Sequence, residues 1–119
     1  MARGIYSAIG WWPGSELPAA LAALDELTGR INAGEPVTEP AAVHEAIEAI
    51  RAFETVVGEP CGIEAGRVAT PDGPAIELGN VGHKAFGAEH EHAARVVAIR
   101  LQAVLDAFGA TRTMWFTLD

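Results

Sequence analysis

The feature that most constrains the fold is a hairpin motif near the middle of the chain. Residues 71–74 read Pro-Asp-Gly-Pro and separate two alternating segments, residues 61–70 and 75–81. Proline presets a turn and glycine accepts a positive φ, so the motif predicts two antiparallel strands joined by a tight turn. Gly66 changes the phase of the alternation, which predicts a bulge there.

Three other segments carry apolar residues at helical spacing. The first follows Ser15, a candidate N-cap, and ends at Gly34; the second begins at Thr38 or Glu39 and ends at Gly58; the third covers residues 86–108. Their apolar stripes are Leu17, Leu21, Leu24, Leu27 and Ile31; Val43, Ile47, Ile50, Phe53 and Val57; and Ala93, Val97, Leu101, Val104, Leu105 and Phe108. The short link between the first two segments predicts an antiparallel helix hairpin.

Extended segments also lie near both ends, at residues 3–9 and 111–118. When the helix hairpin counts as one element, the order is β-α-β-β-α-β. The sequence therefore predicts one α+β domain over residues 1–119. Its four-stranded antiparallel sheet has helices on one face and the terminal strands side by side, as in a ferredoxin-like (split βαβ) variant with a helix hairpin in place of the first helix. An α+β layer with another strand order is the alternative.

The alternation in the two terminal strands separates a core side from an open side. We expect Ile5, Ser7 and Ile9 on the core side of the first strand. In the last strand the same side carries Met114, Phe116 and Leu118. The open side then presents Tyr6, Thr113, Trp115 and Thr117, with Glu77 as a further candidate. Two aromatic residues on an open sheet face predict a partner interface, for example in a homodimer, although aromatic residues in strands are also ordinary packing residues.

Charge narrows the class of partner. The chain has 16 acidic and 8 basic residues, a net charge of −8, and Lys84 is its only lysine. This balance disfavours direct binding to nucleic acid, whose phosphates would be repelled, and suits either a basic protein partner or simple solubility. No apolar run approaches the ~20 residues of a membrane span. The single cysteine, Cys61, excludes an intramolecular disulfide, and we expect a cytoplasmic protein.

Residues 79–92 hold three of the four histidines around a predicted strand-to-helix turn. Glycine and a helix N-terminus favour an anion, so Gly82, His83, Lys84 and His90 are candidate ligand-binding residues. Trp12, from the tryptophan pair within residues 10–14, is a further candidate ligand-binding residue, because tryptophan is frequent at binding sites. A turn that only reverses the chain is the alternative.

The histidines of the same segment do not suit a metal site. His90 and His92 are two residues apart and point in different directions on a helix, so they cannot chelate one ion together. A metal site would need a remote ligand such as His44. We therefore predict no metal and no cofactor.

These observations favour a small acidic protein-interaction module, an accessory or inhibitor protein that docks on a partner or self-associates as a homodimer. The alternative is a small-molecule or anion-binding protein, or a small enzyme, that uses the Gly79–His92 loop with His83 or His90 as the base. No catalytic residue is assigned, because the chain has no nucleophile motif.

Overall fold

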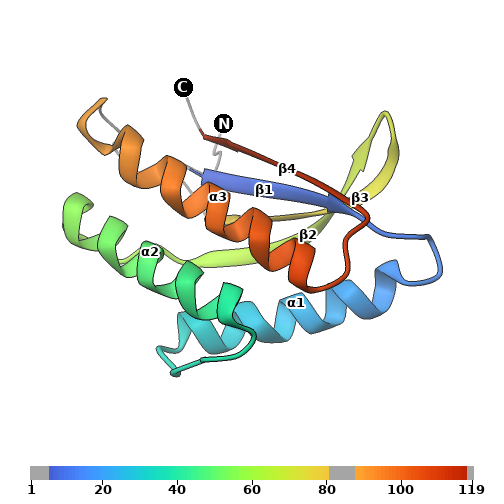
Figure 1. Cartoon of the computed structure of the whole chain (residues 1–119), viewed down its shortest axis with the longest axis horizontal. Coiled ribbons are helices and arrows are strands. Elements are labelled where there is room, and N and C mark those ends of the chain that lie inside the picture. The colour runs from blue at the N-terminus through green and yellow to red at the C-terminus, as the bar shows by residue number, and fades with distance from the viewer. Residues whose placement is uncertain (1–5, 81–87, 118–119) are drawn as a thin grey trace.

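The computed structural model describes residues 6–80 and 88–117. Figure 1 shows the elements, which follow in the order β1 (Tyr6–Trp11), α1 (Leu17–Asn32), α2 (Ala41–Val57), β2 (Ile63–Thr70), β3 (Gly73–Asn80), the 3₁₀ turn η1 (Ala88–His90), α3 (Glu91–Ala107) and β4 (Arg112–Thr117). The predicted α+β architecture with a four-stranded antiparallel sheet is confirmed.

The strands lie in the order β2-β3-β1-β4, and every neighbouring pair is antiparallel. The terminal strands β1 and β4 pair as predicted, with Ala8 opposite Trp115. The hairpin also forms where the sequence predicts it, and Gly73 adopts a positive φ of 107° at its turn. The register of β2 and β3 is continuous through Gly66, so the predicted bulge is wrong.

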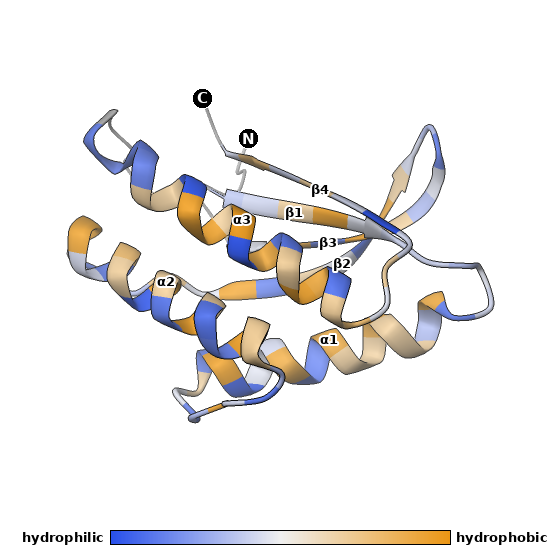
Figure 2. Ribbon diagram, in the orientation of Figure 1, coloured by the Kyte–Doolittle hydropathy of each residue, from blue (hydrophilic) through white to orange (hydrophobic). Residues whose placement is uncertain are grey.

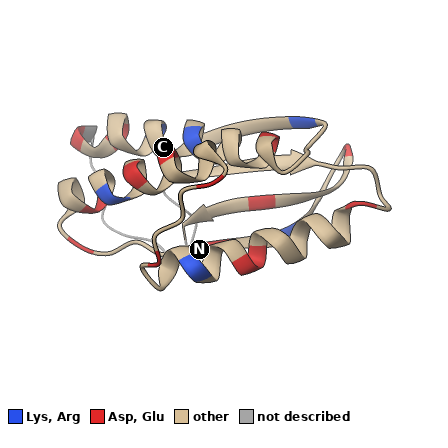
Figure 3. Cartoon of the chain, turned by 60° about the horizontal axis from the view of Figure 1, so that its bottom comes forward, with Lys and Arg blue, Asp and Glu red and all other residues tan. Residues whose placement is uncertain are grey.

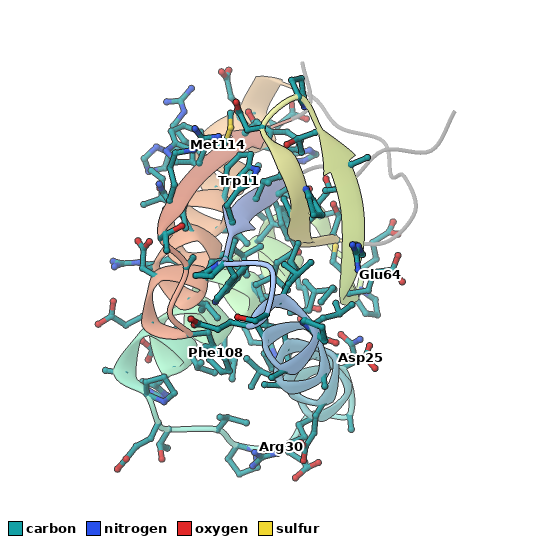
Figure 4. All side chains as sticks on the ribbon, turned by 90° about the vertical axis from the view of Figure 1, so that its right-hand side faces the viewer. Trp11, Asp25, Arg30, Glu64, Phe108 and Met114 are labelled. Carbon is teal, nitrogen blue, oxygen red and sulfur yellow. The ribbon has the colours of Figure 1, made fainter. Side chains whose placement is uncertain are left out.

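All three helices cover the same face of the sheet. α3 packs against β1 and β4, α1 packs against β2, and α2 packs against α3. Apolar residues line the sides of the helices that face the sheet (Figure 2). One buried cluster joins them to Ile63, Ile76, Leu78, Tyr6 and Ala8 of the strands. The open face therefore lies on the other side, and Figure 4 shows Trp11 and Met114 on the opposite side of the molecule from Asp25 and Arg30 of α1.

The predicted orientation of β1 and β4 is wrong. Tyr6 and Ala8 are fully buried beneath the helices, whereas Met114 is 48 % exposed. The physical reason is the close approach of α3, which places its small residues Ala94 and Ala98 in the same buried cluster as Ala8. Small residues allow a helix to lie close to a sheet, so Ala8 faces α3 and the larger Ile9 next to it faces the other side.

The start of α1 also differs from the prediction. The helix begins at Leu17 with Glu16 at the N-cap, and no side chain caps it, so the predicted cap at Ser15 is wrong. The end of α2 agrees with the prediction, since Gly58 has the left-handed φ of 88° expected of a helix C-cap.

Candidate protein-interaction surface

The open face of the sheet carries a continuous apolar strip on β1 and β4. Ile9 pairs directly with Met114, and Ser7 pairs with Phe116. Ile9 and Phe116 are half-buried, and Met114 is largely exposed. Because opposite residues of an antiparallel pair lie on one face, these side chains form a single patch, which we call the apolar strip (Ile9, Met114 and Phe116).

Carboxylates lie beside the apolar strip on the other two strands. Glu77 of β3 is directly opposite Ile9, and Glu64 of β2 is opposite Gly79. Glu77 is half-buried and Glu64 is exposed. The open face therefore carries the apolar strip on β1 and β4, with two carboxylates beside it on β2 and β3. A partner that matches both features carries apolar side chains next to a basic one.

One end of the open face is closed by the side chain of Trp11. The Arg112 guanidinium lies 4.0 Å from the centroid of its ring, and its indole N–H donates to Thr70 Oγ1 over 3.1 Å. Arg112 also donates to Asp72 Oδ2 at 2.7 Å. Trp11 is consequently buried at 9 % exposure, although no helix of the described residues covers it. Its role here is to pack the end of the sheet.

The edge strand β2 is held by a side chain of α1. Asn32 Nδ2 donates to the Ile63 carbonyl at 2.7 Å, and the Ile63 N–H donates to Asn32 Oδ1 at 3.0 Å. One side-chain amide thus satisfies both backbone groups of the first β2 residue, as a neighbouring strand would. We call this pair of bonds the Asn32 clamp.

A pocket of about 440 Å³ opens beside the Asn32 clamp, where α1, α2 and the start of β2 meet. Its polar lining groups bond to one another. Arg51 donates to the Ile31 carbonyl at 2.9 Å and to the Glu54 carboxylate, and Glu54 Oε2 accepts the Cys61 N–H at 2.9 Å. These bonds tie the ends of both helices to β2, so the pocket is explained by structural contacts.

The residues predicted to form a partner interface face the helices instead. Tyr6 is fully buried and packs edge-on against Phe53 with 5.1 Å between ring centroids. Thr113 Oγ1 donates to Asp106 and accepts from Gln102, both on α3. Trp115 packs against the core, and Thr117 lies opposite Tyr6. These four residues therefore lie on the covered side of the sheet.

The Tyr6 hydroxyl is buried and has no hydrogen-bond partner among the described residues. Burial is the main reason that the pKa of its phenol is raised well above the ordinary value, and the nearby Cys61 and Glu54 raise it further. The neutral phenol is the form that the fold holds.

The predicted ligand-binding residues do not form one site within the described chain. Gly82, His83 and Lys84 lie outside the described residues. Trp12 is buried, and its indole N–H donates to the Phe108 carbonyl at the end of α3. His90 precedes α3 at its other end, with Nε2 3.7 Å from Glu89 Oε2. Phe108 comes 18 residues after His90, about 27 Å along the helix, so Trp12 and His90 cannot line one pocket.

The two tryptophans pack on opposite faces of the sheet. Trp12, predicted at a ligand, joins the buried cluster, whereas Trp11 lies on the open face. Gly10 makes this possible, because a Cβ there would lie 3.1 Å from the Trp12 ring.

Within residues 6–80 and 88–117, no three His, Cys, Asp or Glu side chains are placed to hold a metal ion. Among the helices of this described part, none has the length and apolar character that crossing a membrane requires.

The chain matches no protein-family model, and no curated protein is significantly similar to it.

Proposed function

We propose that this chain is a small protein-interaction module that binds a basic partner on the open face of its sheet. The observation that carries the proposal is the pairing of the apolar strip with the carboxylates of Glu64 and Glu77 on a face that no described helix covers. Apolar contact supplies most of the binding free energy, while the carboxylates select a partner with arginine or lysine.

The overall charge supports the same class of partner. The chain has a net charge of −8, and acidic residues occur on all three helices as well as on the strands (Figure 3). A negative field of this kind speeds the encounter with a basic protein and disfavours nucleic acid. The module would act as an accessory or inhibitor protein, by occupying a basic surface of its partner.

We also infer that the fold is a ferredoxin-like (split βαβ) variant in which α1 and α2 together replace the first helix. The strand order β2-β3-β1-β4 with antiparallel neighbours supports this reading, because each helical connection then joins parallel strands on either side of a third. The many functions of that plan mean that the surface, and not the fold, carries the functional argument.

Selection from a displayed library of random peptides tests the proposal with a defined probe. We expect enriched peptides to carry arginine or lysine beside aromatic or aliphatic residues. Glu77→Lys and Ile9→Thr should each weaken binding of these peptides by about tenfold or more, as measured by fluorescence titration.

The matched control is Glu48→Lys, which makes the same charge change at an exposed position of α2. It should leave peptide affinity within about twofold of the parent. Peptides that bind the Glu77→Lys variant as tightly as the parent, or a selection without enrichment, would reject the open face as the binding surface.

A further inference from the structure

The two outer edges of the sheet differ in how their backbone is satisfied. On β2 the Asn32 clamp occupies both backbone groups of Ile63. On β4 the inner side pairs with β1, and within residues 6–80 and 88–117 no strand pairs with its outer side. An exposed strand edge offers a row of N–H and C=O groups to another strand.

The sequence of β4 has few of the features that protect an edge. Its six residues, Arg-Thr-Met-Trp-Phe-Thr, include no glycine, proline or lysine, and the one charge is at the first position. β-Branched and aromatic residues of this kind favour strand pairing. By contrast, the exposed residues of β2 include Glu64, Gly66 and Arg67, which make that edge a poor template.

Exposed apolar side chains lie on both sides of the β4 edge. The strongly exposed large apolar residues of the described chain are Val56, Ile99 and Met114, at 51 %, 42 % and 48 %. Met114 belongs to β4 itself. Ile99 lies on α3 between Arg95 and Gln102, four and three residues away, so these residues share one stripe of the helix.

The stripe continues to Asp106 and faces the β4 side of α3. Gln102 and Asp106 both bond to Thr113 of β4, whereas Arg100, on the other side of α3, pairs with Glu45 of α2. We call Arg95, Ile99, Gln102 and Asp106 the α3 stripe. α2 therefore covers one flank of α3 and leaves the α3 stripe beside the free edge.

We propose that a second copy of this chain pairs with the β4 edge. The two β4 strands run antiparallel about a two-fold axis, the sheets join into one of eight strands, and the α3 stripes of both copies pack together. This interaction goes beyond the proposed binding of a basic partner, because it uses the edge of the sheet and not its open face.

Standard spacings show that the edge and the helices fit at once. α3 packs against both β1 and β4 and so lies over the line between them. Continuing the sheet across β4 then places the two α3 helices two strand spacings apart, about 10 Å. Helices pack at about 8–10 Å, so strand pairing brings the two stripes into contact without rearrangement.

The charges of the α3 stripe match when two copies run antiparallel. A two-fold axis midway between Ile99 and Gln102 places Arg95 of each copy opposite Asp106 of the other. Arg95 and Asp106 lie eleven residues apart, about 16 Å, so they cannot pair within one chain. Within one chain Arg95 pairs with Glu91 at 2.8 Å, so Asp106 of the other copy shares the Arg95 guanidinium with Glu91.

The two-fold axis that suits the α3 stripes also suits the pairing of the two β4 strands. Thr113 bonds to both Gln102 and Asp106, so it lies level with the point on α3 halfway between them. The centre of the α3 stripe, midway between Ile99 and Gln102, is 3.5 residues from that point, about 5 Å along the helix. About 5 Å along β4 is roughly one and a half residues beyond Thr113. A symmetric antiparallel register must be centred on a residue, and this distance selects Met114 or Trp115.

Light scattering after size exclusion tests the proposal. The parent should elute as a dimer of twice 12.5 kDa at about 100 μM protein. Met114→Lys and Ile99→Glu should each lower the dimer affinity by tenfold or more, with unchanged circular dichroism and melting. Val56→Glu, at an equally exposed apolar position of α2, should remain dimeric.

Charge reversal reports on the contact between the helices. Arg95→Glu and Asp106→Arg should each weaken the dimer about tenfold, and the double variant should recover most of the loss. A purely structural role of either residue within one chain would not give this recovery.

Three outcomes would overturn the proposal: a parent that is monomeric up to about 0.5 mM, a dimer that survives both Met114→Lys and Ile99→Glu, or a double reversal as weak as the single changes. If a variant unfolds, amide hydrogen exchange of the parent replaces it, and β4 should be more protected at high than at low concentration. Ile99→Glu leaves the open face intact, so its peptide binding separates this proposal from the proposed function.

Discussion

The two edge strands of the sheet, β2 and β4, show two ways in which a small sheet can end. The edge of β2 is occupied at its first residue by a side chain from α1, because Asn32 satisfies both backbone groups of Ile63. β4 has an apolar, strand-forming sequence, and no strand of the described chain pairs with its outer side. The difference indicates that protection against edge pairing is applied selectively, and that the unprotected edge is available for assembly.

Among changes at the two edge strands, removal of the Asn32 clamp from β2 should have the largest effect. Asn32→Ala removes both bonds to Ile63 and leaves its backbone groups to solvent, so we expect a loss of about 1–2 kcal/mol in the free energy of unfolding. The variant should also form species larger than a dimer, because both edges are then open. Urea denaturation and light scattering measure the two effects.

Glu26→Ala, a truncation at an exposed position of α1, is the control for this variant. Its unfolding free energy should stay within about 0.5 kcal/mol of the parent. An Asn32→Ala protein as stable and as uniform in mass as the parent would show that the clamp does not protect β2.

The next effect concerns the covered side of β1, between the two edges. Tyr6→Phe removes a buried hydroxyl that has no described hydrogen-bond partner, so we expect an increase in stability of about 1 kcal/mol at neutral pH. This change should leave the dimer unaffected, because Tyr6 lies beneath the helices. Chemical denaturation at pH 7 measures it.

The pH dependence of the stability difference between the parent and Tyr6→Phe gives a second readout. The pKa of Tyr6 is raised in the folded chain, so its contribution is complete below the ordinary tyrosine pKa of about 10 and declines above it, where the unfolded chain ionises. The stability difference in favour of Tyr6→Phe should therefore grow above pH 10. A difference that stays constant to pH 11 would show that the phenol is not held neutral. Tyr6 is the only tyrosine, so tyrosinate absorbance reports on it alone.

The smallest effect tests whether Gly66 contributes to the protection of β2. A Cβ at Gly66 meets no atom within 4 Å, and its φ is not positive. Gly66→Thr should therefore stabilise the strand by about 0.5 kcal/mol through its higher strand propensity, without changing the mass in solution. If Gly66→Thr promotes larger assemblies, the glycine protects the edge together with the Asn32 clamp.

Local chemistry made the elements and their pairing predictable. The Pro-Asp-Gly turn, the glycine after α2 and the leucine stripe of α1 each act within a few residues, and all three appear in the structure. The side on which the helices pack does not follow from the alternation of residues alone. Alternation separates two faces of β1, but the close approach of α3 selects the face with Ala8 and Gly10, against the larger Ile9.

Only part of the candidate surface could be predicted from the sequence. An open face with aromatic and apolar residues was predicted, but the inverted orientation assigned it Tyr6 and Trp115 in place of Ile9, Met114 and Phe116. The small residues Ala8, Ala94 and Ala98 are the signal that could have corrected the assignment. The Asn32 clamp joins residues 31 positions apart, so no local pattern reveals it.

The central position of β1 in the sheet has a consequence for synthesis of the chain. β1 leaves the ribosome before the other strands, yet one of its two neighbours, β4, follows about a hundred residues later. At about 5–20 residues per second this delay is on the order of 5–20 s. During that interval a nascent chain presents an unpaired side of β1 to other nascent chains, and binding by a chaperone would be most useful then.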